Sequence, residues 1–200
     1  MCDYSPPKDK MPEAEVALRL AFFLLDHHEV DGTVKVAIDG ASVSRTVPIF
    51  QIECFMKIHK WEEFGAKNGL NDWQREYKRG KQRLEIHSNS GEGDVVAKIN
   101  GYRIRAECKK GPLQKTKGNP EYPLLREAIG QLMTIETIEN NDIPIAVVPH
   151  SEKFKQLADK WMERPLLKRV GIQIVLVSRD DIQNVHGLTI PPKTLWNQTD

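Results

Sequence analysis

A β-hairpin with charged residues at its open end is the feature that most constrains how this chain can fold. Residues 94–99 (DVVAKI) and 102–110 (YRIRAECKK) alternate as strands do, and the Asn-Gly dipeptide at 100–101 is typical of a two-residue hairpin turn. Alternate residues of a strand share a face, so Glu107 and Lys109 are expected to be neighbours on one face. The pattern therefore predicts a hairpin whose last residues carry a carboxylate and an ammonium group side by side.

The tight turn also predicts the register of the two strands. With the turn at 100–101, Ile99 faces Tyr102, and counting outward to the open end places Asp94 opposite Glu107. Directly opposed residues have Cβ atoms about 5 Å apart, and two like charges at that distance are unfavourable. A divalent cation that bridges the two carboxylates is the ordinary remedy.

These groups fit the metal-assisted hydrolysis of a phosphodiester. Mg²⁺ prefers hard oxygen ligands and is commonly held by one or two carboxylates with waters and a phosphate, and Mn²⁺ is expected to substitute for it. We expect Asp94 and Glu107 to bind the metal, and the main-chain carbonyl of Cys108 to complete the shell. Lys109 can then hold or deprotonate the attacking water and steady the charge that develops on the phosphate.

The rest of the chain alternates between helical and strand patterns. Apolar spacing predicts helices at 12–28, 124–139 and from Ser151 onward, strands at 33–40, 83–88, 143–150 and 172–178, and a possible hairpin from 33–40 into 43–50. The segment from 50 to 64 reads better as a helix than as a strand, and a short exposed helix is expected before Gly80. This order predicts an α/β fold with a mixed central sheet flanked by helices on both faces.

The 200 residues suit one domain of ordinary size. Residues 1–12 are polar and Pro-rich and are predicted to be a flexible arm. Residues 13–200 are then a single domain with its core at about 83–178 and an insertion or accessory segment at about 42–82.

Composition limits the classes of partner and compartment. The 29 basic and 28 acidic residues give a net charge of +1, so any site for nucleic acid has to be a local patch. The three cysteines lack CxxC spacing, which argues against a zinc knuckle or a disulfide framework and favours a reducing cytoplasm. The most apolar run, 15–25, is too short and too charged for a membrane span, and no basic segment precedes it as in a signal peptide.

The segments GEGDVV and RAECKKG joined by a turn, then the helix 124–139 and the apolar strand 143–148, resemble the PD-(D/E)xK nuclease superfamily. The resemblance covers about residues 91–150, with the helix 12–28 as a candidate first core helix, and implies a restriction-endonuclease-like fold. It also implies that Asp94 and Glu107 bind the metal and that Lys109 positions the water.

The resemblance has departures and optional features. Gly93 stands where the family usually has proline. Some members contact DNA through a Gln and a Tyr four residues apart on the helix that follows the hairpin, and here Gln131 is followed by Ile135 instead. Some members recruit a further metal ligand from the first helix, a role open to Glu13 or Glu15.

The resemblance implies a Mg²⁺-dependent nuclease, by expectation an endonuclease acting on DNA. The basic loop with Lys110, Lys115 and Lys117 is expected to grip backbone phosphates, and symmetric cutting of both strands would require a homodimer. One alternative is a catalytically inactive protein of the same fold that serves as a nucleic-acid-binding or assembly module. Another is an unrelated α/β enzyme or interaction domain in which 91–111 is an ordinary surface hairpin.

Overall fold

The computed structural model describes residues 6–39, 50–89, 91–115, 117–181 and 184–192. A mixed sheet of nine strands runs through this part of the chain in the order β11-β10-β9-β7-β6-β2-β5-β4-β3. The strands are β2 (Val34–Ala37), β3 (Glu62–Lys67), β4 (Arg75–Arg79), β5 (Gln82–His87), β6 (Val95–Ile99), β7 (Tyr102–Cys108), β9 (Asp142–Pro149), β10 (Gln173–Val177) and β11 (Val185–His186). The predicted α/β class with a mixed sheet is confirmed.

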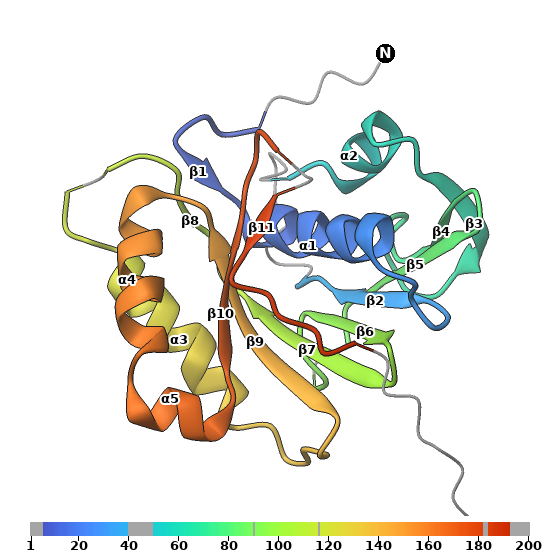
Figure 1. The fold of residues 1–200 in the computed structure, drawn as a ribbon. Helices are drawn as coiled ribbons and strands as arrows, with labels where there is room; N and C mark the ends of the chain where they lie inside the picture. The colour runs from blue at the N-terminus through green and yellow to red at the C-terminus, as the bar shows by residue number, and fades with distance from the viewer. Residues whose placement is uncertain (1–5, 40–49, 90, 116, 182–183, 193–200) are drawn as a thin grey trace, which may run out of the picture.

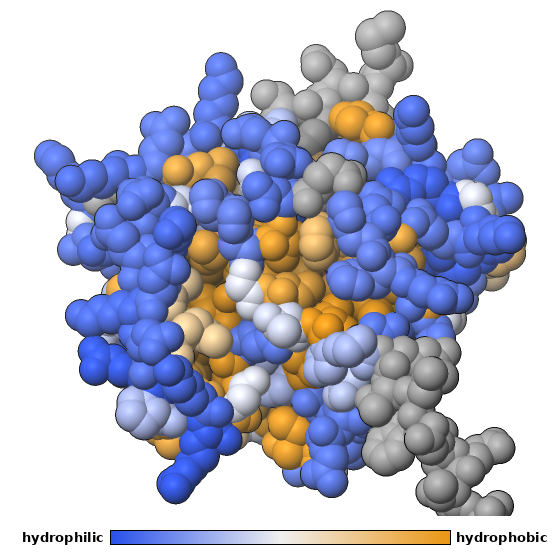
Figure 2. Space-filling view, viewed as in Figure 1, coloured by the Kyte–Doolittle hydropathy of each residue, from blue (hydrophilic) through white to orange (hydrophobic). Residues whose placement is uncertain are grey.

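Helices cover both faces of the sheet, as predicted (Figure 1). One hydrophobic core lies beneath the long helix α1, and a second lies between the other face of the sheet and α3 and α4. The helices are α1 (Glu13–His27), α2 (Ile52–Ile58), α3 (Glu121–Leu132), α4 (Glu152–Met162) and α5 (Pro165–Val170). Figure 2 shows hydrophobic residues gathered in the middle of the face seen in Figure 1 and hydrophilic residues around its rim.

The predicted hairpin is present as β6 and β7. Its register pairs Ile99 with Tyr102 and Val95 with Ala106, as the Asn-Gly turn required. β7 also pairs in parallel with β9, which follows α3, so the hairpin lies in the interior of the sheet. The open end of the hairpin therefore lies near the N-terminus of α1 and beside α3.

Two predictions about the flanking segments were wrong. The segment before Gly80 is not a helix but the strand β4, with Tyr77 only 2% exposed, because β3 and β5 pair with it on either side. The helix predicted at 124–139 begins at Glu121 and ends at Leu132. Proline at position 123 does not interrupt it, because the first turn of a helix needs no donor there.

The N-terminal segment and the accessory segment both join the fold where they are described. Residues 10 and 11, which the sequence placed in a flexible arm, form β1 (Lys10–Met11) and pair with β8 (Gly111–Pro112). Met11 is fully buried and belongs to the hydrophobic core beneath α1. Residues 52–87 form α2 and then add β3, β4 and β5 to the sheet. The possible hairpin into 43–50 falls almost wholly outside the described residues.

None of the helices in the described ranges combines the length and apolar character that a membrane span requires.

Candidate functional site

Hydrogen bonds of Asp94 extend the β6–β7 ladder one residue beyond its last regular pair, Val95 with Ala106. Its main-chain N–H donates to Ala106 O at 2.7 Å, and its carbonyl accepts from Ala37 N–H on β2 at 2.8 Å. Its carboxylate oxygen Oδ2 accepts from the Cys108 N–H at 2.7 Å. The carboxylate is therefore held at the end of β7, beside Glu107.

Gly93 is what allows Asp94 to reach this position. Gly93 has φ +116°, and a Cβ atom there would lie 2.9 Å from the Ala106 carbonyl oxygen. A side chain would be strained by the backbone conformation and would also press on the hairpin. Proline is excluded because its ring holds φ near −65°.

Replacing Gly93 with alanine is expected to destabilise the fold by roughly 1–3 kcal/mol, through strain at positive φ and contact with main-chain oxygen. The free energy of unfolding from urea denaturation measures the loss. Gly91→Ala is the matched control, because Gly91 also has positive φ (+124°) but a Cβ atom added there would meet no other atom within 4 Å. Equal losses in both variants would show that the contact with Ala106 does not matter.

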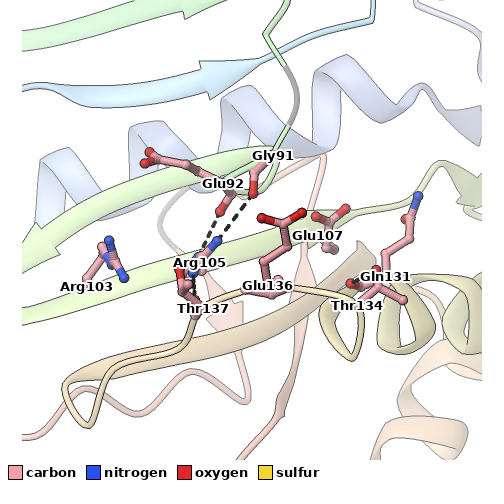
Figure 3. A pocket seen from close by; sticks show the side chains of 10 residues that line it. Gly91, Glu92, Arg103, Arg105, Glu107, Gln131, Thr134, Glu136 and Thr137 are labelled. Carbon is pink, nitrogen blue, oxygen red and sulfur yellow. Dashed lines mark hydrogen bonds between the residues drawn. The ribbon is translucent and has the colours of Figure 1, made fainter.

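Glu107 faces away from the α1 core and lines a cavity of about 520 Å³ (Figure 3). Gln131 from α3 and Glu136 from the loop after α3 line the same cavity. Arg105 closes its far side by donating to the main-chain oxygens of Glu92 at 3.0 Å and Thr137 at 2.6 Å. Gln131 therefore shares a cavity with Glu107, as its place on the following helix suggested.

Burial disfavours the charged forms of both Asp94 and Glu107. Burial raises the pKa of Asp94 to about 6, although the Cys108 N–H and Lys109 both act to lower it. Burial raises the pKa of Glu107 to about 7, and the neighbouring charge of Asp94 adds to the shift. Burial is therefore the main cause of both shifts, and the charge of Asp94 is a further cause for Glu107.

Lys109 is 5% exposed, and its Nζ lies 3.6 Å from Glu13 Oε1 and 3.5 Å from Glu127 Oε1. Burial acts to lower the pKa of Lys109, but the carboxylates around it outweigh burial and the pKa is raised. They are, in falling order of effect, Glu13, Asp94, Glu127 and Glu107. Carboxylates therefore surround the Lys109 ammonium group. They favour its charged form over the neutral amine that could act as a base.

The structure separates the two glutamates of the first helix. Glu15 is fully buried and accepts from Arg19 at 2.8 Å and Arg179 at 2.9 Å. Arg179 also donates to Lys10 O at 2.8 Å, so it ties the N-terminal segment to the residues that follow β10. Glu13 instead lines one small cavity with Asp94 and another with Lys109. Residues two apart on a helix point about 200° apart, so only one of them can face the hairpin. Glu13 is the one that does.

The basic residues of the predicted phosphate-binding loop are exposed. Lys110 follows Lys109 directly, and Lys115 and Lys117 lie on the loop between β8 and α3. Glu127 was missed by the sequence argument. It lies one helical turn before Gln131 on α3, and this i, i+4 spacing was the signal that could have found it.

The ligands at this site suit a hard divalent cation that keeps several of its waters. They do not form a shell in which protein groups alone coordinate the metal. Across the described residues, no group of three or more His, Cys, Asp or Glu side chains is arranged to hold a metal. Asp94 and Glu107 offer two carboxylates. The Cys108 N–H donates to the Asp94 carboxylate. The N–H and C=O groups of one strand residue point toward the same neighbouring strand, so the Cys108 carbonyl lies on the same side of β7. Two carboxylates and a carbonyl suit Mg²⁺, which keeps several of its waters.

No family model, curated protein or solved structure matches this chain.

Proposed function

We propose that the protein is a Mg²⁺-dependent nuclease of the PD-(D/E)xK type that hydrolyses DNA phosphodiester bonds, as an endonuclease. The observation that supports the proposal is the hydrogen bond that holds the Asp94 carboxylate at the Cys108 N–H, at the open end of the β6–β7 hairpin between Glu107 and Lys109. The helix α3 and the buried parallel strand β9 follow the hairpin in the order expected for a restriction-endonuclease-like fold.

The residues of the site would have separate roles in metal binding and in phosphodiester hydrolysis. Asp94 and Glu107 would hold the metal with the Cys108 carbonyl, and Mn²⁺ would substitute for Mg²⁺. The metal, when bound, lowers the pKa of its water and offsets charge on the phosphate. The Lys109 ammonium orients the attacking water and stabilises the negative charge that develops on the phosphate oxygens. Glu13 and Glu127 position Lys109 by holding its Nζ at 3.6 and 3.5 Å.

Gly93 is compatible with the proposal although the family usually has proline there. The positive φ and the nearby Ala106 oxygen require glycine, and the Asp94 carboxylate still reaches the end of β7. The exposed Lys110, Lys115 and Lys117 would bind flanking phosphates with a salt-sensitive contribution to affinity. These contacts carry no sequence information by themselves.

Plasmid cleavage tests the proposal. The wild-type chain is expected to nick or linearise supercoiled DNA in Mg²⁺ or Mn²⁺ and to be inactive in EDTA. Glu107→Gln is expected to abolish cutting, because it removes one of the two metal-binding carboxylates. Glu29→Gln changes an exposed glutamate outside the site and is expected to cut like the wild type.

The alternative is a catalytically inactive nucleic-acid-binding or assembly module of the same fold. The ion pairs of Lys109 with two glutamates are the observation in its favour, because their negative charges already offset the charge of the ammonium group. A wild-type chain that binds DNA in Mg²⁺ and Mn²⁺ without cutting it would establish this alternative and refute the nuclease.

A further inference from the structure

A second cavity, of about 450 Å³, lies on the α3–α4 side of the molecule. The loop between β8 and α3 forms one wall, and the N-terminal ends of α3 and α4 form the others. In Figure 1 this loop leaves β8 and passes beside the start of α4. None of its lining residues belongs to the metal-binding group proposed above.

Glu121 in the wall of this cavity has a buried acceptor without a partner. Its side chain is 2% exposed, and no described residue donates a hydrogen bond to its Oε2 atom. A buried carboxylate oxygen without a donor costs free energy, and nearly all such groups in native proteins are paired. A donor from a bound molecule would remove that cost.

The rest of the cavity wall favours negative charge. Two lysines, Lys115 and Lys153, outnumber the one further acid, Glu152, and α4 begins there with Ser151 as its N-cap. The N-termini of α3 and α4 add the positive ends of two helix dipoles. A free cation is disfavoured by these charges, and a simple anion is disfavoured by Glu121. The matching ligand brings N–H donors and a negative group together, as a nucleotide does.

The distance along α3 suits a nucleotide of the proposed substrate. Glu127, whose Oε1 lies 3.5 Å from Lys109 Nζ, comes six residues after Glu121 on the same helix. At 1.5 Å of rise per residue, Glu121 lies about 9 Å along the axis from that point. One strand of a duplex advances about 3.4 Å per nucleotide, so a substrate strand that ran along α3 would cover this distance in about two or three nucleotides.

We infer that this cavity recognises a guanine base of the substrate, an inference that rests on the proposed nuclease function. A carboxylate accepts hydrogen bonds and donates none. Guanine presents N1–H and N2–H₂ side by side with no acceptor between them. In cytosine and adenine the amino group adjoins a ring acceptor, and in thymine N3–H lies between two carbonyl oxygens. Glu121 would bind the unstacked guanine edge, and Lys115 and Lys153 would bind its phosphate.

Binding of the four deoxynucleoside 5′-monophosphates to the full chain in EDTA tests the inference without cleavage. By calorimetry or NMR, deoxyguanosine monophosphate is expected to bind about tenfold tighter than the other three. Glu121→Gln is expected to remove this preference and to leave binding of the phosphate. The same variant is expected to raise the Tm by about 2–4 °C, because an amide costs less free energy than a carboxylate when it is buried without a full set of partners.

Glu53→Gln is the matched control, since Glu53 is an exposed acid in the first turn of α2. It should change neither base preference nor Tm. Equal binding of all four nucleotides, an unchanged preference in Glu121→Gln or a loss of Tm in that variant would each overturn the inference. A guanine preference without plasmid cleavage would refute the nuclease but support the guanine site. Plasmid cleavage without a base preference would support the nuclease but refute the guanine site.

Discussion

Replacing Lys109 with methionine is expected to slow DNA cleavage by on the order of 10²–10³-fold, because the variant loses the positive charge next to the developing phosphate charge. Methionine keeps most of the apolar stem of this buried side chain, so the change is mainly electrostatic. Single-turnover cleavage under saturating Mg²⁺ measures the chemical step separately from DNA binding and product release. DNA affinity in Ca²⁺, measured by fluorescence anisotropy, is expected to change little.

The same variant also leaves Glu13 and Glu127 without the ammonium group that lies 3.6 and 3.5 Å from them. A loss of roughly 1–3 kcal/mol in the free energy of unfolding is expected, discounted because both glutamates are partly exposed. Lys109→Arg keeps the charge but not the shape of the ammonium group. It is therefore expected to restore most of the stability and, because the rate loss of Lys109→Met comes from the lost charge, part of the rate.

Lys98→Ala removes an exposed lysine from β6 and serves as the matched control for both readouts. Near-normal cleavage by Lys109→Met would refute the role of Lys109 in the reaction. A rate loss in Lys109→Met that disappears when the rates are compared at equal fractions of folded protein would show that Lys109 acts by stabilising the fold.

The hairpin could be predicted from sequence because its signals are local. The Asn-Gly turn at 100–101 determines the register within two residues, and the alternation on each side confirms it. The neighbourhood of Asp94 and Glu107 follows from that register alone. The hydrogen bond from Cys108 N–H to the Asp94 carboxylate does not, since it depends on the strands ending their regular pairing at Val95.

The errors fall where tertiary contacts decide the outcome. In REYKR, the charged residues are good helix formers, and only Tyr77 is buried, so local propensity favoured a helix over β4. Pairing with both β3 and β5 overrides that preference. The choice between Glu13 and Glu15 depends on the rotation of α1 about its axis, which is determined by packing and by the distant Arg179. No local pattern contains that information.

Replacing Asp94 with asparagine is expected to separate metal binding from folding. Asparagine keeps an oxygen that can accept the Cys108 N–H at the same place, so the local geometry is retained. It removes one of two anionic ligands, and Mn²⁺ affinity measured by calorimetry is expected to fall about tenfold or more. Mg²⁺-dependent cleavage is expected to be lost with it, whereas Asp31→Asn, an exposed control, should leave both unchanged.

The metal-free Asp94→Asn variant is expected to be more stable than the wild type at pH 8. The pKa of Asp94 is raised from 3.8 to about 6, so ionisation costs the wild type stability as the pH rises through that range. The gain is expected to be small near pH 4 and to reach roughly 1–2 kcal/mol above pH 6, after a discount for solvent screening. Urea denaturation in EDTA at the two pH values measures it. A variant less stable than the wild type at pH 8 would mean that Asp94 stabilises the hairpin through its charge, and the paired carboxylates would then need no cation.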